Sequence, residues 1–130
     1  MKTFKLRIIT LKGIEEKEIR YLKLRDESGF FGIMAGHTDF LTIVEPGVGE
    51  YIASDHQKRY IATDSGFLLI FSGMVTLSVY EIFEGSSPEE LADLIAEQIS
   101  KRKSAEARYR KLITEIEETF LKRALEIYRV

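Results

Sequence analysis

Acid–base chemistry near neutral pH would depend first on histidine, and the chain has two, His37 and His56. His37 lies in the stretch GFFGIMAGHTDFL at residues 29–41. Imidazole is the side chain whose ordinary pKa places its charge change near pH 7, so His37 is the strongest candidate. A lone histidine beside glycine is more often a hydrogen-bonded turn residue, and two histidines without cysteine are too few for a transition-metal cluster. We expect no metal site, no cofactor and no catalytic histidine.

Carboxylates, serines and glycines are the remaining candidates for catalysis. Glu15-Glu16 and Glu117-Glu118 are adjacent pairs that predict solvated faces, because neighbouring side chains on a helix do not face each other. No serine lies in a G-x-S-x-G turn, which would expose a nucleophile. Glycines 29, 32 and 36 resemble a phosphate loop, but the G-K-[ST] ending that contacts phosphate and Mg²⁺ is missing. We therefore predict that the chain alone is not an enzyme.

Composition and charge favour one ordinary soluble domain, or one domain with an appendage. The chain has 130 residues, of which 45% are hydrophobic and 31% charged, and its formal net charge is -2. The charge excludes a general attraction to nucleic acid, although residues 101–111 contain six basic side chains. No apolar run reaches the roughly 20 residues that span a bilayer. We expect neither a nucleic-acid partner nor a transmembrane segment.

The first two-thirds of the chain alternates between apolar and polar residues, which is typical of strands with one face in a core. Phe4, Leu6 and Ile8 form one such series, and Val75, Leu77 and Val79 form another. Turn-forming residues separate about eight such runs, which predicts a β-sandwich or a flattened barrel. At residues 67–71 the alternation is lost, as expected for a strand covered on both faces.

Glycine and proline mark a boundary near residue 85. All nine glycines lie between Gly13 and Gly85, and neither glycine nor proline follows Pro88. We predict a β-sandwich domain over residues 1–85 and a helical domain over residues 86–130. Ser87-Pro88-Glu89-Glu90 is a capping box, with serine at the N-cap, proline at N1 and glutamate at N3.

Two apolar stripes at three-to-four spacing run through the helical region. The segment between them is compatible either with a turn between two helices or with one continuous helix. Residues 101–108 separate the stripes without a large apolar side chain, which favours an antiparallel hairpin that turns near Ser104. The stripes are nearly in phase, however, so one helix about 60 Å long, at ~1.5 Å per residue, fits as well. A sequence that permits both is what a two-state element requires. The first stripe holds Leu91, Leu94, Ile95 and Ile99, and the second holds Tyr109, Leu112, Ile113, Ile116, Phe120, Ala124, Leu125 and Tyr128.

Two longer segments resemble the epsilon subunit of F-type ATP synthases, which is called delta in mitochondria. They are ESGFFGIMAGHTDFLTIVEPG at 27–47 and IATDSGFLLIFSGMVTLSV at 61–79. The resemblance implies a ten-stranded β-sandwich followed by an antiparallel two-helix hairpin. The matching residues are Gly29, Gly32, Ile33, Gly36, His37, Pro46 and Gly47 in the first motif, and Gly66, Gly73, Val75 and Thr76 in the second.

The same resemblance implies a non-catalytic rotor subunit on the central stalk. Such a subunit binds the gamma subunit and the ring of c subunits, couples rotation to proton or sodium transport, and can inhibit ATP hydrolysis through its helices. It lies peripherally at the cytoplasmic face of the bacterial cell membrane. Contact with the alpha and beta subunits through the basic helices is a further option.

Partner-binding residues follow from the resemblance position by position. Residues 27–31 correspond to the tip that faces the c-ring, and Gly36 and His37 correspond to positions near gamma. Exposed Phe30 and Phe31 would make an apolar patch, and Gly32 and Gly36 would let the backbone turn and approach a partner closely. The expected partner-binding set is Glu27, Ser28, Gly29, Phe30, Phe31, Gly32, Ile33, Gly36, His37, Phe40 and Leu41. The expected hinge and basic collar, facing an acidic protein surface, is Lys101, Arg102, Lys103, Ser104, Arg108, Arg110 and Lys111.

The sequence departs from the family pattern at two places, and one further stretch resembles a particular branch of the family. Phe30 stands where many members carry an acidic residue, so the ring contact is expected to be apolar. Residues 91–96 lack both the aspartate in register and the arginine of the ATP-binding motif of some bacterial members, so no ATP binding, or only weak binding, is expected. EETFLKRA at 117–124 resembles the N-type branch, whose synthases are associated with sodium transport. The alternatives are a nucleotide-sensing module and a stand-alone adaptor that binds protein, or nucleic acid through its basic helix.

Overall fold

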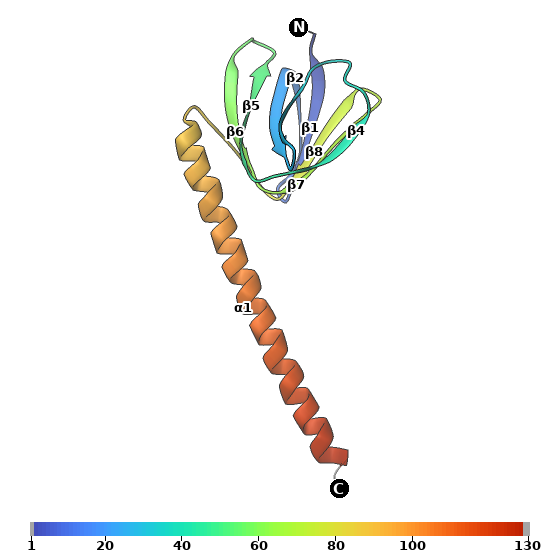
Figure 1. Cartoon of the computed structure of the whole chain (residues 1–130), viewed down its shortest axis with the longest axis vertical. Coiled ribbons are helices and arrows are strands. Elements are labelled where there is room, and N and C mark those ends of the chain that lie inside the picture. The colour runs from blue at the N-terminus through green and yellow to red at the C-terminus, as the bar shows by residue number, and fades with distance from the viewer. Residues whose placement is uncertain (1, 129–130) are drawn as a thin grey trace. The chain divides into compact units, whose positions relative to one another are not determined.

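The computed structural model describes residues 2–128, without the side chain of Tyr128, as one β-sheet and one helix (Figure 1). The described residues form nine strands, where the resemblance implies ten. The strands are β1 Phe4–Thr10, β2 Gly13–Asp26, β3 Gly29–Ile33, β4 Phe40–Val44, β5 Gly47–Ala53, β6 Lys58–Thr63, β7 Gly66–Phe71, β8 Met74–Val79 and β9 Ile82–Gly85, and the helix is α1 Pro88–Tyr128.

The sheet follows the order β4-β7-β8-β1-β2-β5-β6-β9, and β3 pairs separately with β2. All neighbours are antiparallel except β1 and β8, which run parallel. Because β4 and β9 end the path without pairing with each other, the sheet of the described residues is open rather than closed into a flattened barrel. The predicted β-sandwich is confirmed, but the predictions of ten strands and of closure are wrong.

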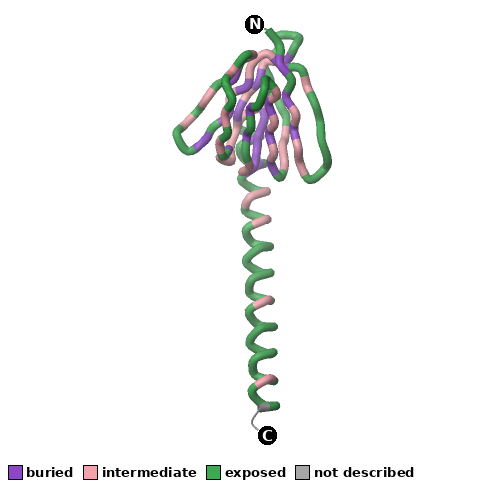
Figure 2. The backbone as a smooth tube through the Cα atoms, turned by 90° about the vertical axis from the view of Figure 1, so that its right-hand side faces the viewer, coloured by how far each residue is buried: buried purple, intermediate pink, exposed green. Residues whose placement is uncertain are grey.

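The core consists of the residues that the alternation predicted. Phe4, Leu6 and Ile8 of β1 are buried, and so are alternate residues of the neighbouring strand β8. Figure 2 shows buried segments among the strands of the sheet. Alternate burial on paired strands places one face of each strand in a shared core, as expected for a pleated sheet.

Strand β2 shows how a break in alternation can mark a backbone irregularity. Ile19, Leu22 and Leu24 are all buried, although Ile19 and Leu22 are an odd number of residues apart. The pairing of β2 with β5 shifts register between Ile19 and Tyr21. A β-bulge at this position restores the inward direction of the later side chains.

Strand β7 differs from its prediction. Leu68 and Ile70 are buried in the core, whereas Phe67, Leu69 and Phe71 are exposed. The strand therefore alternates in space even though all five residues are apolar. The prediction that the strand is covered on both faces is wrong for the chain by itself, because the described residues cover only one face.

The helical region is a single helix, and the predicted hairpin with its turn near Ser104 is wrong. The segment between the two stripes has no helix-breaking residue, and ion pairs one turn apart stabilise it as a helix. Lys101 lies 3.1 Å from Glu97, and Arg110 lies 3.9 Å from Glu106. The helix begins as predicted, since the backbone amide of Glu90 donates to Ser87 Oγ at 3.3 Å.

Residue contacts divide the chain into two compact units, Met1–Ala96 and Glu97–Val130. The first two turns of α1 belong to the first unit, where Leu91 and Ile95 are buried. In the second unit most apolar residues of the stripe are exposed, among them Tyr109, Leu112 and Phe120. The division into domains at residues 85 and 86 stays a prediction. Within residues 2–128 no helix combines the length and the apolarity that crossing a bilayer requires.

Candidate partner-binding surface

An apolar surface covers the side of strands β4 and β7 that faces away from the core. The register pairs Leu41 with Leu69 and Ile43 with Phe67, and all four side chains are exposed. Phe71 extends the series along β7. We call these five residues the outer face. Five large exposed apolar residues on two adjacent strands are more than scattered surface residues, and such a patch marks an interaction site.

Pairing across the sheet shows where the outer face ends. Leu69 is paired with Thr76 of β8, which is paired in turn with Arg7 of β1. Arg7 is bound to Glu16 of β2 at 3.0 Å. The surface thus changes from apolar to polar and charged within three strands of β4, so the outer face has a polar border.

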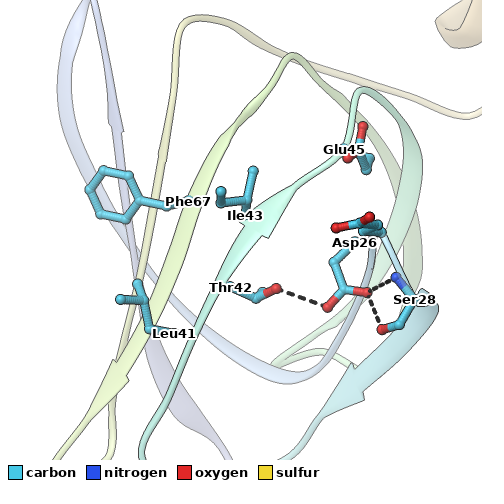
Figure 3. Close-up of a pocket in the computed structure, with 8 residues that line it drawn as sticks. Asp26, Ser28, Leu41, Thr42, Ile43, Glu45 and Phe67 are labelled. Atoms are coloured by element: carbon cyan, nitrogen blue, oxygen red, sulfur yellow. Dashed lines mark hydrogen bonds between the residues drawn. The ribbon is translucent and has the colours of Figure 1, made fainter.

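A hollow of about 850 Å³ adjoins the outer face at β4 (Figure 3). Leu41, Ile43 and Phe67 of the outer face form its apolar side. The β2–β3 turn and the end of β4 supply its polar side. The polar lining residues are Asp26, Glu27, Ser28, Thr42 and Glu45, and they include no lysine or arginine. Among the described residues these carboxylates do not form a group that could hold a metal ion.

Asp26 connects the β2–β3 turn to β4. Its Oδ1 accepts hydrogen bonds from the backbone amide of Ser28 at 2.9 Å and from Ser28 Oγ at 2.6 Å, and its Oδ2 accepts one from Thr42 Oγ1 at 2.9 Å. The hydrogen bonds from the Ser28 and Thr42 hydroxyls lower the pKa of Asp26 and outweigh the opposite effect of desolvation. Because all three donors favour the ionised carboxylate, Asp26 fixes the turn that carries Glu27 and Ser28.

The glycine-rich stretch at residues 29–41 divides between the core and the surface. Ile33, a member of the expected partner-binding set, is 0% exposed and lies in the core. Phe31 is half-buried and packs edge-on against Phe40, with ring centroids 5.8 Å apart, so the expectation that Phe31 is exposed is wrong. Phe30 is exposed as expected. The amino group of Lys23 lies 4.9 Å from the centroid of the Phe30 ring, which is a cation–π contact.

His37 is held in a turn. Its backbone amide donates to the carbonyl of Met34 at 3.3 Å, and its Nδ1 lies 2.8 Å from the carbonyl oxygen of Thr38. Its ring lies against Phe40, with centroids 5.7 Å apart. These contacts match the turn interpretation of this histidine.

Gly32 and Gly36 have different physical reasons for being glycine. Gly36 has a φ of 83°, which glycine adopts without strain, and nothing lies within 4 Å of the position of a Cβ. A Cβ on Gly32 would lie 2.5 Å from the hydroxyl of Tyr21. The close approach at Gly32 is therefore to a side chain of the chain itself, whereas no atom of the chain lies near the Cβ position of Gly36.

The hollow brings together only part of the predicted partner-binding set. Glu27, Ser28 and Leu41 meet at the hollow, whereas Phe30 lies on the other side of the β2–β3 hairpin, with Lys23. The predicted collar residues all lie within α1, in the second unit. The sequence interpretation missed Asp26, Thr42, Ile43, Glu45, Phe67, Leu69 and Phe71. The lost alternation at 67–71 was a signal for three of these.

Comparison with known proteins gives one family. Residues 3–85 match the family described as ATP synthase, Delta/Epsilon chain, beta-sandwich domain. The ATP synthase epsilon chain of Nitratiruptor sp. is 30% identical over 100 residues, which cover 75% of this chain and 78% of the relative. The ATP synthase epsilon chain 2 of Paraburkholderia xenovorans is 35% identical over 60 residues, which cover 46% of this chain and only 43% of the relative.

Solved structures agree on the fold. A chain of the Euglena gracilis mitochondrial ATP synthase, solved as OSCP/F1/c-ring, superposes with a TM-score of 0.61 at 20% identity. The superposition covers 78% of this chain and 66% of that chain. A chain of the central stalk and c-ring of the Tetrahymena thermophila mitochondrial ATP synthase gives a TM-score of 0.53 at 10% identity, with 64% and 69% covered.

Proposed function

The chain belongs to the family of ATP synthase delta/epsilon chains, and from this premise we propose that it is a non-catalytic rotor subunit of the central stalk. In this role it binds the gamma subunit through the outer face and couples rotation to ion transport. It also contacts the ring of c subunits through residues 27–31. The subunit is peripheral and works at the cytoplasmic face of the bacterial membrane.

The outer face is the observation that carries the proposal. A chain in water gains nothing from exposing Leu41, Ile43, Phe67, Leu69 and Phe71 together, since each would be more stable away from water. A permanent partner removes this cost. The polar border at Arg7 and Glu16 is also typical of a protein interface, where an apolar centre is surrounded by a polar rim.

A pair of leucines provides a matched test of binding to the cognate gamma subunit. Leu69 lies in the outer face with 38% of its surface exposed, and Leu94 lies on α1 in the same compact unit with 39% exposed. A partner can remove from water only the 38% of the Leu69 surface that is exposed, which corresponds to about 0.6–1.1 kcal/mol, or roughly three- to sevenfold in affinity. We expect Leu69→Ser to raise the Kd for gamma by about that factor, with Leu94→Ser as the control.

Calorimetry or surface plasmon resonance with purified full-length variants measures these affinities. Both variants are expected to keep the far-ultraviolet circular dichroism spectrum of the unmodified chain. Equal affinities of the two variants for gamma would reject the outer face as the binding site. Absence of gamma binding by the unmodified chain would reject the rotor function itself.

The second unit supports a regulatory role within the same proposal. Its helix presents an exposed apolar stripe, and Lys103, Arg108 and Lys111 add exposed positive charges to it. Such a helix fits the acidic surface of another subunit, with alpha and beta as the candidates, and it would slow ATP hydrolysis when bound there. A stop after Ala96 retains the buried Leu91 and Ile95. We expect the truncated chain to assemble and the ATPase rate to rise; an unchanged rate in every nucleotide condition would leave the helix without an inhibitory role.

A further inference from the structure

The hollow beside the outer face has an unusual charge arrangement. Glu27 and Glu45 line it, and neither carboxylate has a hydrogen-bond or ion-pair partner among the described residues. Three glutamates elsewhere in the sheet do form ion pairs: Glu16 with Arg7, Glu50 with Lys58 and Glu84 with Lys17. Two acidic groups at one hollow without a positive neighbour attract a positive charge from outside.

Asp26 is not available for such a partner, because its two oxygens already accept three hydrogen bonds from Ser28 and Thr42. It instead fixes the position of the turn that carries Glu27. Glu45 is held in a similar way, since its backbone amide donates to the carbonyl of Arg25 at 2.9 Å. Both free carboxylates therefore stand on anchored backbone, so little conformational freedom is lost when they bind a partner.

The opposite side of the hollow is apolar and continuous with the outer face. Leu41 and Ile43 project from β4 toward Phe67, while Thr42 turns toward Asp26 (Figure 3). A long basic side chain fits both sides, because its methylene stem can lie along apolar groups while its charged end reaches carboxylates.

We infer that the hollow receives a lysine or arginine side chain from an apolar segment of gamma, and that Glu27 and Glu45 select this segment. The inference rests on the proposed function and names the chemistry of its partner. Within the segment 27–31 proposed above for the c-ring, it reassigns Glu27 to the gamma-binding site and leaves Phe30, with Lys23, to the contact with the c-ring. The hollow then supplies charge-based selectivity, and the outer face supplies most of the affinity.

The double variant Glu27→Gln/Glu45→Gln tests the inference, because it removes both charges and keeps the size of the side chains. The probe is the cognate gamma subunit, and the readout is the association rate constant at two ionic strengths. At about 0.01 M the screening length is ~30 Å, and at about 0.15 M it is ~8 Å, so a steering charge acts mainly at low salt. We expect association at low salt to slow by about tenfold, and the salt dependence to become weaker than that of the unmodified chain.

Glu18→Gln/Glu81→Gln is the matched control, because it removes the same charge from sandwich positions outside the hollow. The control is expected to retain the rate and the salt dependence of the unmodified chain. If both double variants behave alike while Leu69→Ser still weakens binding, the role of Glu27 and Glu45 is overturned and the rotor function stands. If the unmodified chain does not bind gamma, both proposals fail.

Discussion

Two leucines on paired strands allow a direct measurement of how far the outer face is free of contacts within the chain. Leu68 of β7 is 0% exposed, and Leu41 of β4 is 66% exposed. We consider the substitutions Leu68→Ala and Leu41→Ala, which delete the same atoms from the two environments.

The expected losses of stability differ several-fold. Leu68→Ala removes fully buried atoms and leaves a cavity, which costs about 2–5 kcal/mol. Full burial of a leucine contributes about 1.5–3 kcal/mol, so Leu41, which is one-third buried, contributes about 0.5–1 kcal/mol. The free energies of unfolding of the two variants should thus differ by about 1–4.5 kcal/mol.

Urea denaturation followed by tyrosine fluorescence measures this difference. The chain has no tryptophan, and four of its six tyrosines, the buried Tyr51 among them, lie in the sandwich, so the tyrosine emission reports mainly on that unit. The slope of the free energy against urea concentration should be the same in all variants, because the surface exposed on unfolding hardly changes. If Leu41→Ala costs as much as Leu68→Ala, the outer face is covered in the free chain and the reasoning for a docking surface fails.

Three further predictions concern the turn, the sheet and the helix start. Because the pKa of Asp26 is lowered in the folded state, its ionised form stabilises the fold above the ordinary aspartate pKa of about 4. The unmodified chain should therefore be more stable than Asp26→Asn in thermal unfolding at pH 7, and this advantage should disappear as the pH falls through the folded-state pKa; an advantage independent of pH would contradict the assignment. Gly66→Ala should destabilise the fold in urea denaturation, since its Cβ would lie 1.9 Å from the backbone oxygen of Ser78. Unchanged stability would show that β7 and β8 move apart without cost to admit the added methyl group. Ser87→Ala should lower helix stability by about 1 kcal/mol, observed by circular dichroism on heating, and no change would mean that the cap contributes nothing.

The sequence predicted the parts of the fold that repeat locally. Phe4, Leu6 and Ile8 alternate in the sequence and are buried together in the structure, because a strand sends successive side chains to opposite faces. The capping residue Ser87 was found for a similar reason, since its partner Glu90 is only three residues away.

Features that depend on distant contacts, or on surroundings beyond the chain, were not predictable in the same way. The contact of Asp26 with Thr42 joins two strands across 16 residues, and no short motif announces it. At residues 67–71 the apolar run was interpreted as a strand covered twice, but a sequence cannot distinguish a cover from its own chain from a cover by a partner. The hairpin prediction failed because a hairpin and one unbroken helix are both compatible with the apolar stripes. The ion pairs of Glu106 with Arg102 and Arg110 favour the unbroken helix.

Calorimetric titration of the full-length chain with the cognate gamma subunit, at several temperatures, tests the central claim most directly. Burial of the outer face should give saturable one-to-one binding with a negative heat-capacity change, because that change reports apolar surface removed from water. Leu69→Ser should reduce its magnitude. Absence of saturable heat, or binding with a heat-capacity change near zero, would contradict the assignment of the outer face to gamma.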